Sequence, residues 1–186
     1  MKKILAIILV SILFITGCSS GSINSSNENN EEYQNEKVSI YDFWINDMEN
    51  ELELSDDSSK FIEDNNNLFP TNNKEEVSKL VDNSITYKHI NKNIKQYYKS
   101  IIKFEGYVID VQEEEIEEGN KATILHVADD NMQSYEILYL GELKDIFKED
   151  KISVIGLPLG IGGFENTDGG YTNTIVIAGS YIEKLQ

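Results

Sequence analysis

The sequence contains no arginine, so all 16 of its basic side chains other than histidine are lysines. Arginine supplies the planar bidentate fork that recognises phosphate groups and guanine edges, and affinity for nucleic acid comes largely from many cationic contacts to phosphates. The chain also carries 33 acidic residues and a formal net charge of −17. The missing arginine and the excess of acid together predict that nucleic acid is a poor candidate partner.

Cysteine is almost as scarce, because Cys18 is the only one in the chain. A lone cysteine excludes an intrachain disulfide and a multi-cysteine metal site. Cys18 follows a lysine pair, an apolar run over 4–15 and Thr16-Gly17. This order is the three-part layout of a secretory signal. The apolar run is too short for a membrane-spanning helix, which needs about 20 residues.

The segment Ile15-Thr16-Gly17-Cys18 resembles the lipobox that the lipoprotein signal peptidase recognises. Small residues before the cut fit that protease, and the cysteine sulfur accepts the lipid. We therefore predict a signal peptide over 1–17 and acylation of Cys18. The expected location is the extracytoplasmic face of the cell membrane, where the lipid would hold the chain.

Removal of residues 1–17 takes away two lysines and no acid, so the mature chain would carry a formal charge of −19. Residues 18–37 are mostly Ser, Asn and Glu, a composition that cannot bury enough apolar surface to offset the entropy of ordering. We predict a disordered tether there. The chain thereafter divides into a helical region over 38–98 and a β-rich domain over 99–186.

Apolar residues recur at three- and four-residue steps in the helical region, at Tyr41, Trp44, Met48 and Leu52. A second short helix would carry Phe61 and end before Pro70, and Thr71 could cap a third. The segment 84–104 contains no acid and five lysines. We interpret it as an amphipathic helix whose lysines face solvent and pair with neighbouring carboxylates, in preference to a binding surface.

Five strands are expected in the C-terminal half, at 101–111, 122–127, 134–140, 151–157 and 172–182. Gly106 suggests a bulge or sharp coil in the first strand, 142–147 is long enough for one or two helical turns, and 160–170 reads as a glycine-rich loop. Three strands, a short helix and two strands match the OB-fold, a five-stranded Greek-key barrel. The predicted fold class is therefore α+β, with a small helical region followed by an OB-fold barrel.

Four runs of the sequence are also similar to a known family, namely Ile85–Asn93, Tyr97–Ser100, Ile102–Val108 and Phe147–Gly156. They resemble the tRNA-anticodon-binding-like OB domain found in many secreted proteins and lipoproteins of Gram-positive bacteria. Ile94 and Ser100 stand where that family often has proline and glycine. The resemblance implies an OB-fold and carries no activity.

No catalytic constellation is apparent. The two histidines, His89 and His126, have no His or Cys companion, and the glycines at 160–163 are not followed by the Lys-Ser or Lys-Thr pair of a phosphate loop. The acidic turns at 129–131 and 165–168 could hold calcium but lack EF-hand spacing, and we favour ordinary turns. No enzyme activity, cofactor or metal is predicted.

OB-folds bind ligands across strands two and three, between the loops that join strands one and two and strands four and five. The side chains that would line these loops, together with an exposed residue of the first strand, are the predicted binding residues: Tyr107, Glu113, Glu114, Glu115, Glu165 and Asp168. An acidic rim of this kind repels phosphate. The leading hypothesis is a non-enzymatic binding or assembly module for an envelope protein. The alternatives are a cell-wall hydrolase or hydrolase subunit that uses two loop carboxylates, and single-stranded nucleic-acid binding by the OB face.

Overall fold

The computed structural model describes residues 28–47, 52–117, 120–165 and 169–185. Helical elements come first: α1 (Glu28–Asp47), α2 (Asp56–Asp64), η1 (Asn66–Leu68), α3 (Lys74–Ser78), α4 (Tyr87–Lys92) and η2 (Ile94–Gln96). The strands follow: β1 (Ile102–Glu117), β2 (Asn120–Ala128), β3 (Ser134–Tyr139), β4 (Lys151–Glu165) and β5 (Tyr171–Lys184). Among the described residues, no helix has both the length and the apolar character needed to cross a bilayer.

The five strands close into a barrel in the order β1-β2-β3-β5-β4, and the pairing of β3 with β5 is parallel while the others are antiparallel. This is the Greek-key topology of an OB-fold. The strand β1 is long enough to pair with β4 over 102–107 and with β2 over 107–117. The α+β class and the OB topology predicted from the sequence are therefore confirmed.

Gly106 lies at the corner where β1 passes from one partner strand to the other. A Cβ atom added there would lie 2.6 Å from a methyl of Val127 and 2.7 Å from the carbonyl oxygen of Ala128. The expected bulge lies slightly later, between Val108 and Asp110. Close approach of β2 therefore requires the glycine, and the register shift follows it.

Alternation along the strands sorts their side chains into an inner and an outer set. The inner set packs into the barrel with Leu125 and Val127 of β2 and Ile137 of β3. One end of this interior is closed by aromatic rings, since Tyr135 stacks on Phe104 at 3.9 Å between centroids and meets Tyr87 of α4 edge-on at 5.6 Å. The tyrosines of β3 thus belong to the barrel core.

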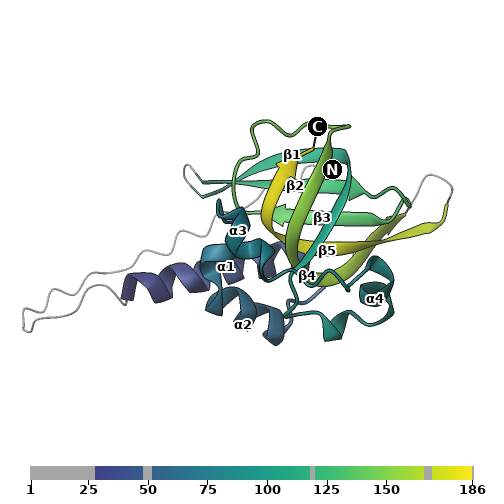
Figure 1. Cartoon of the computed structure of the whole chain (residues 1–186). Coiled ribbons are helices and arrows are strands. Elements are labelled where there is room, and N and C mark those ends of the chain that lie inside the picture. The colour runs from purple at the N-terminus through teal and green to yellow at the C-terminus, as the bar shows by residue number, and fades with distance from the viewer. Residues whose placement is uncertain (1–27, 48–51, 118–119, 166–168, 186) are drawn as a thin grey trace, which may run out of the picture.

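The outer set on β3, β5 and β4 is buried under the N-terminal helices, which lie along one side of the barrel in Figure 1. Tyr41, Trp44 and Ile45 of α1 belong to the same buried cluster as Leu138 of β3 and Ala122 of β2. Two hydrogen bonds fix this contact: the Thr71 N–H donates to the carbonyl of Ser180, and the Ser180 hydroxyl donates to the carbonyl of Leu68. The helical region and the barrel therefore share a core.

Several elements differ from the sequence-based expectations. The helix α1 already begins at Glu28, within the stretch expected as tether, and α3 is capped by the Asn73 side chain, which accepts from the Glu76 N–H, rather than by Thr71. The lysine-rich segment forms the short helices α4 and η2 in place of one long helix. The signal peptide and Cys18 lie outside the described residues.

Two expected loops and one expected helix are also wrong. The acidic stretch 113–117 continues β1, and the glycine-rich stretch 160–165 continues β4, because each pairs with the strand that returns beside it. Residues 142–147 form turns instead of a helix. That connection is held to β1 by two backbone hydrogen bonds, in which the Glu149 N–H donates to the Val108 carbonyl and the Val108 N–H donates to the Asp150 carbonyl.

Candidate functional site

A pocket of about 170 Å³ lies on the outward face of the barrel, beside the part that α1 covers. Its floor comes from three adjacent strands and its wall from the β4–β5 hairpin, and its lining residues are Asp110 and Gln112 of β1, Ile124 and His126 of β2, Glu136 of β3 and Phe164 of β4. We call these six residues the OB-face pocket. Asp110 and Gln112 are exposed, so the pocket opens to solvent.

Register explains why these residues meet. Asp110 faces His126 across the β1–β2 pair, and His126 faces Glu136 across the β2–β3 pair. Side chains directly opposite on adjacent strands have Cβ atoms about 4.5–5.5 Å apart. A row of three ionisable side chains therefore crosses the floor of the pocket.

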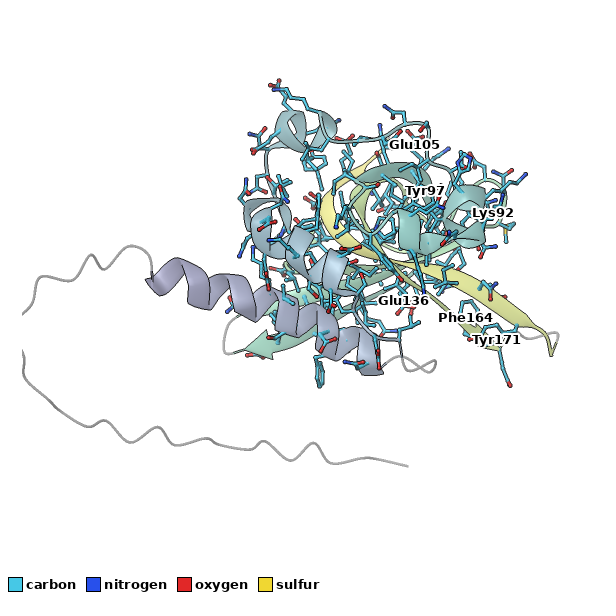
Figure 2. The ribbon with its side chains drawn as sticks, turned by 90° about the horizontal axis from the view of Figure 1, so that it is seen from below. Lys92, Tyr97, Glu105, Glu136, Phe164 and Tyr171 are labelled. Carbon is cyan, nitrogen blue, oxygen red and sulfur yellow. The ribbon has the colours of Figure 1, made fainter. Side chains whose placement is uncertain are left out.

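Phe164 comes from the hairpin formed by β4 and β5, which projects from the barrel in Figure 1. The pairing of Phe164 with Thr172 and of Gly162 with Thr174 extends this hairpin beyond the barrel wall. The phenylalanine ring lies edge-on to the His126 ring, with 5.3 Å between centroids. Figure 2 shows Phe164 and Tyr171 on the hairpin, with Glu136 nearby. The hairpin thus supplies an aromatic wall above a polar floor.

The His126 ring is held by its own hydrogen bond, since Nε2 lies 2.9 Å from the hydroxyl oxygen of Ser134. The Ser134 hydroxyl in turn donates to the Thr174 hydroxyl at 3.0 Å. Burial lowers the pKa of His126, although the nearby Asp110 carboxylate opposes that shift. The imidazole is therefore predominantly neutral at pH 7.

The pKa values of the two carboxylates of the pocket are shifted in opposite directions. The Gln112 side chain donates to Asp110 at 3.1 Å, and this hydrogen bond is the main reason that the pKa of Asp110 lies below its ordinary value. Glu136 is half-buried, and burial alone raises its pKa. Within the described part of the chain, the Glu136 carboxylate has no hydrogen-bond or ion-pair partner.

The contact between Ser134 and His126 has the spacing of a nucleophile and its base, but the remaining geometry does not support acyl transfer. Ser134 is buried and its proton is directed to Thr174. Among the described residues, His126 donates no hydrogen bond to Asp110. Those residues also contain no cluster of three or more His, Cys, Asp or Glu side chains suited to a metal ion.

None of the predicted binding residues that the structure describes lines this pocket. Tyr107 is exposed, as expected, and the Lys151 ammonium lies 5.3 Å from its ring centroid. Glu165 is exposed at the end of β4, whereas Asp168 lies outside the described residues. The remaining three predicted binding residues are glutamates of β1.

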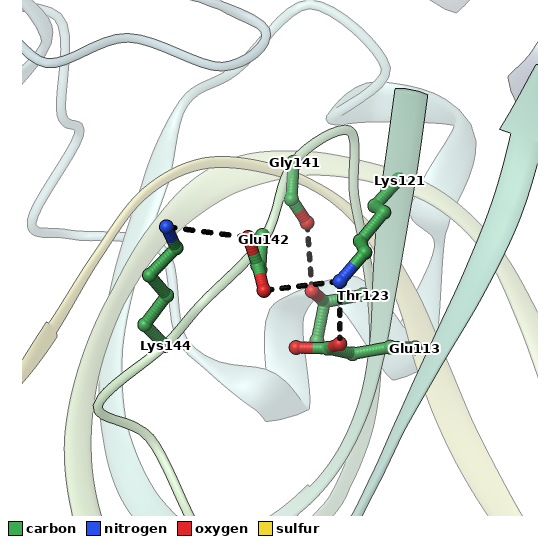
Figure 3. Close-up of polar contacts among 6 residues, drawn as sticks. All are labelled: Glu113, Lys121, Thr123, Gly141, Glu142 and Lys144. Carbon is green, nitrogen blue, oxygen red and sulfur yellow. Dashed lines mark hydrogen bonds and ion pairs between the residues drawn. The ribbon is translucent and has the colours of Figure 1, made fainter. Parts of the chain in front are cut away.

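Those three glutamates, Glu113, Glu114 and Glu115, are exposed strand residues rather than loop residues. Figure 3 shows that Glu113 belongs to a network in which the Lys121 ammonium lies 3.5 Å from Glu113 and 3.1 Å from Glu142, while Lys144 lies 3.6 Å from Glu142. The network joins β1 and β2 to the connection that follows β3. Glu113 therefore has a structural partner within the chain.

The lysines of the segment 84–104 differ from these glutamates in how many of them form ion pairs. Lys99 pairs with Asp57 at 2.6 Å, as expected for that segment. No described carboxylate lies within ion-pair distance of four others, Lys88, Lys92, Lys95 and Lys103, which are all exposed. We call these four residues the lysine surface. The expectation that these lysines answer neighbouring carboxylates holds for Lys99 and is wrong for the other four.

The helix α4, which carries Lys88 and Lys92, adjoins the same hairpin as the OB-face pocket. The hydroxyl of Tyr87, at the start of α4, donates to the carbonyl of Asn173 at 3.4 Å. Asn173 pairs with Gly163, the residue before Phe164. Figure 2 shows Lys92 on the helix beside the hairpin. A ligand held against Phe164 would therefore have Lys88 and Lys92, with which no described carboxylate pairs, on the neighbouring helix.

Comparisons with known proteins found similarity in structure only. No family model matches the chain, and no curated protein sequence matches it. One similar solved structure is the second OB-fold domain of replication protein A from Methanococcus maripaludis, at 15% identity and a TM-score of 0.28, covering 46% of this chain and 83% of that one. Another is a mitochondrial single-stranded DNA-binding protein from S. cerevisiae, at 18% identity and a TM-score of 0.29, covering 47% and 95%.

Two expectations drawn from the sequence need correction, namely that an envelope protein is the partner and that nucleic acid is a poor candidate. The physical reason is the placement of charge: the glutamates expected to rim the binding face do not line the OB-face pocket, and no described carboxylate pairs with the four residues of the lysine surface.

Proposed function

We propose that the chain binds single-stranded nucleic acid, with an unpaired base seated in the OB-face pocket. The observation that carries this proposal is the placement of Phe164, whose ring walls an open pocket on the outward face of β1, β2 and β3. OB-folds bind oligonucleotides on this face. Stacking of a base on an aromatic side chain contributes about 1–3 kcal/mol and is available to a base that is not stacked within a duplex.

The phosphates of such a strand need cationic partners, since the floor of the pocket is acidic. The lysine surface supplies four ammonium groups that no described carboxylate neutralises. Lysine binds phosphate as a point charge, so the absence of arginine removes bidentate recognition and leaves the salt-dependent attraction. The proposed binding is therefore weak and sensitive to ionic strength.

The extent of the site is limited by the N-terminal helices. Ala122 and Leu138, which continue the outward face beyond the pocket, are buried in the cluster that includes Tyr41 and Trp44 of α1. Sites on OB-folds cover about 4–16 nucleotides. The covered face favours a site at the short end of this range, because only the pocket end of the sheet is accessible.

The test is a titration of a fluorescently labelled single-stranded DNA decamer with the purified chain, followed by anisotropy at about 50 and 200 mM salt, where phosphate contacts weaken. We expect saturable binding to the single strand, weakening with salt, and less binding to the same decamer annealed to its complement. Equal affinity for both forms would contradict seating of an unpaired base. Absence of binding to the single strand at the lower salt would refute the proposed function.

We further propose that the chain binds nucleic acid without catalysing a reaction on it. We also propose that the chain is exported and anchored through a lipid on Cys18. The anchor rests on Ile15-Thr16-Gly17-Cys18 and on the signal-like residues before it. Replacement Cys18→Ala should prevent lipid attachment and leave the precursor uncut by the lipoprotein peptidase. Processing and membrane retention of the variant at the level of the parent would refute the anchor.

A further inference from the structure

The hydrogen-bonding groups of the OB-face pocket are predominantly acceptors. The Ser134 hydroxyl gives its proton to Thr174, so its oxygen accepts from Nε2 of His126. A neutral imidazole that donates from one nitrogen accepts at the other. His126 is therefore left with Nδ1 as an acceptor, as long as the ring stays neutral.

Glu136 is the acceptor of the pocket that most needs a hydrogen-bond donor. Its half-buried carboxylate has no donor among the described residues, and a desolvated carboxylate without a donor is costly. Asp110 is a second carboxylate at the same pocket, although Gln112 already donates to it. A ligand that places an N–H donor beside Glu136 would satisfy this group and gain a charge-assisted hydrogen bond.

The four bases differ in what they can offer to such a group. Cytosine and adenine carry an exocyclic amino group, and guanine carries one as well, whereas thymine presents the carbonyl oxygen O4 at the corresponding position. Thymine and uracil have an N–H donor at N3, but it lies between two carbonyl oxygens, one of which would approach the Glu136 carboxylate and weaken a hydrogen bond to it. The pairing of Glu or Asp with the amino group of cytosine is a known form of base recognition.

We infer that the OB-face pocket selects bases that carry an exocyclic amino group over thymine and uracil, with Glu136 accepting from that group. The inference rests on the proposed single-strand binding and adds to it the class of base that the pocket takes. Phe164 and the lysine surface contribute affinity that is the same for every base, because every base has a stacking face and a phosphate. Selectivity therefore comes from Glu136 and is separable from affinity.

The experiment compares labelled homodecamers of dC, dA and dT by anisotropy at one salt concentration and pH 7, for the parent chain and for Glu136→Gln. We expect the parent to bind dC and dA about tenfold more tightly than dT, the size of one charge-assisted hydrogen bond. Glu136→Gln should reduce the ratio to about twofold, because a side-chain amide can both donate and accept. A melting curve of the variant establishes that it is folded.

The matched control is Glu165→Gln, which removes the same charge from the exposed end of β4 and does not line the pocket. It should keep the preference of the parent for dC and dA. Binding of all three decamers with equal affinity, or a preference for dT, would overturn the inference and leave the proposed function standing. A Glu136→Gln variant that keeps the full preference would overturn the assignment to Glu136. Failure of all three decamers to bind would instead refute the proposed function itself.

Discussion

The Phe164 ring lies edge-on to His126 at 5.3 Å between centroids, although the two residues belong to strands that are not adjacent in the barrel. The contact exists because β4 continues past the barrel wall as a hairpin with β5. Phe164 therefore stands over the floor of the OB-face pocket without being part of the sheet that forms it. Phe164 is thereby the aromatic side chain that lines this pocket.

Replacement Phe164→Ala should weaken binding of a single-stranded decamer by roughly tenfold, since stacking of one base contributes about 1–3 kcal/mol. The matched control is Phe147→Ala, because Phe147 is also an exposed aromatic residue and does not line the pocket. Anisotropy titrations of the two variants measure their affinities for the decamer. Equal losses of affinity in both variants, or no loss in Phe164→Ala, would show that Phe164 does not contact the bound strand.

The lysine surface makes a separate prediction about salt. The triple replacement of Lys88, Lys92 and Lys95 by Gln should weaken binding and make its salt dependence shallower by about 2 in the log–log slope, at about 0.7 per phosphate contact in a single strand. A double replacement of Lys60 and Lys144 removes lysines that already pair with Asp64 and Glu142, and should leave the slope unchanged. Identical slopes for the triple variant and the parent would place the phosphates elsewhere.

The replacement Gly106→Ala should lower the free energy of unfolding by about 1–3 kcal/mol, the usual cost of overpacking. The new Cβ would lie 2.7 Å from the backbone oxygen of Ala128, which cannot move without disturbing β2. The control is Gly160→Ala, whose Cβ would meet only the side chain of Leu52, at 3.2 Å. Denaturant unfolding should show the larger loss for Gly106→Ala, and equal losses would contradict the close approach.

The strand order could be predicted because alternation is a local signal: Tyr135, Ile137 and Tyr139 mark a strand with one buried face wherever it pairs. The extensions 113–117 and 160–165 could not, since glutamate and glycine have low strand propensity and are strands here only because a second strand lies alongside. Pairing of this kind is a property of two distant segments. Local composition therefore predicts loops at both places.

The OB-face pocket was missed for a related reason. His126 has no polar companion nearby in the sequence, and its neighbours Asp110 and Glu136 are brought beside it only by the register of β1, β2 and β3. A signal was present, since Asp110, His126 and Glu136 all fall on the outward parity of their strands. It could be used only once the pairing was known, because a shift of one residue would turn each of them to the other face.

Tyr41 provides a test of how α1 packs on the barrel. Its side chain is fully buried, and within the described part of the chain its hydroxyl has no hydrogen-bond partner. Because an unpaired buried hydroxyl is costly, Tyr41→Phe should raise the free energy of unfolding by about 1 kcal/mol. Tyr181→Phe is the control, since that hydroxyl donates to Glu183 at 3.4 Å and its removal should give no gain. A loss of stability in Tyr41→Phe, measured by denaturant unfolding, would show that the hydroxyl is satisfied.

Glu136 should also make stability depend on pH in a particular direction. Burial raises its pKa above the ordinary value of 4.5, so the folded chain binds this proton more tightly than the unfolded chain does. The free energy of unfolding then falls as pH rises from 4.5 through the folded-state pKa, and the loss remains at neutral pH.

Glu136→Gln removes this pH-dependent loss of stability. We expect the variant to melt at a higher temperature than the parent at pH 7, with a difference that shrinks as the pH is lowered toward 4.5. Glu114→Gln, at an exposed position, measures the general effect of removing one negative charge from an acidic chain. If both variants gain equally at pH 7, the gain comes from net charge and the carboxylate of Glu136 is not destabilised by its place in the pocket.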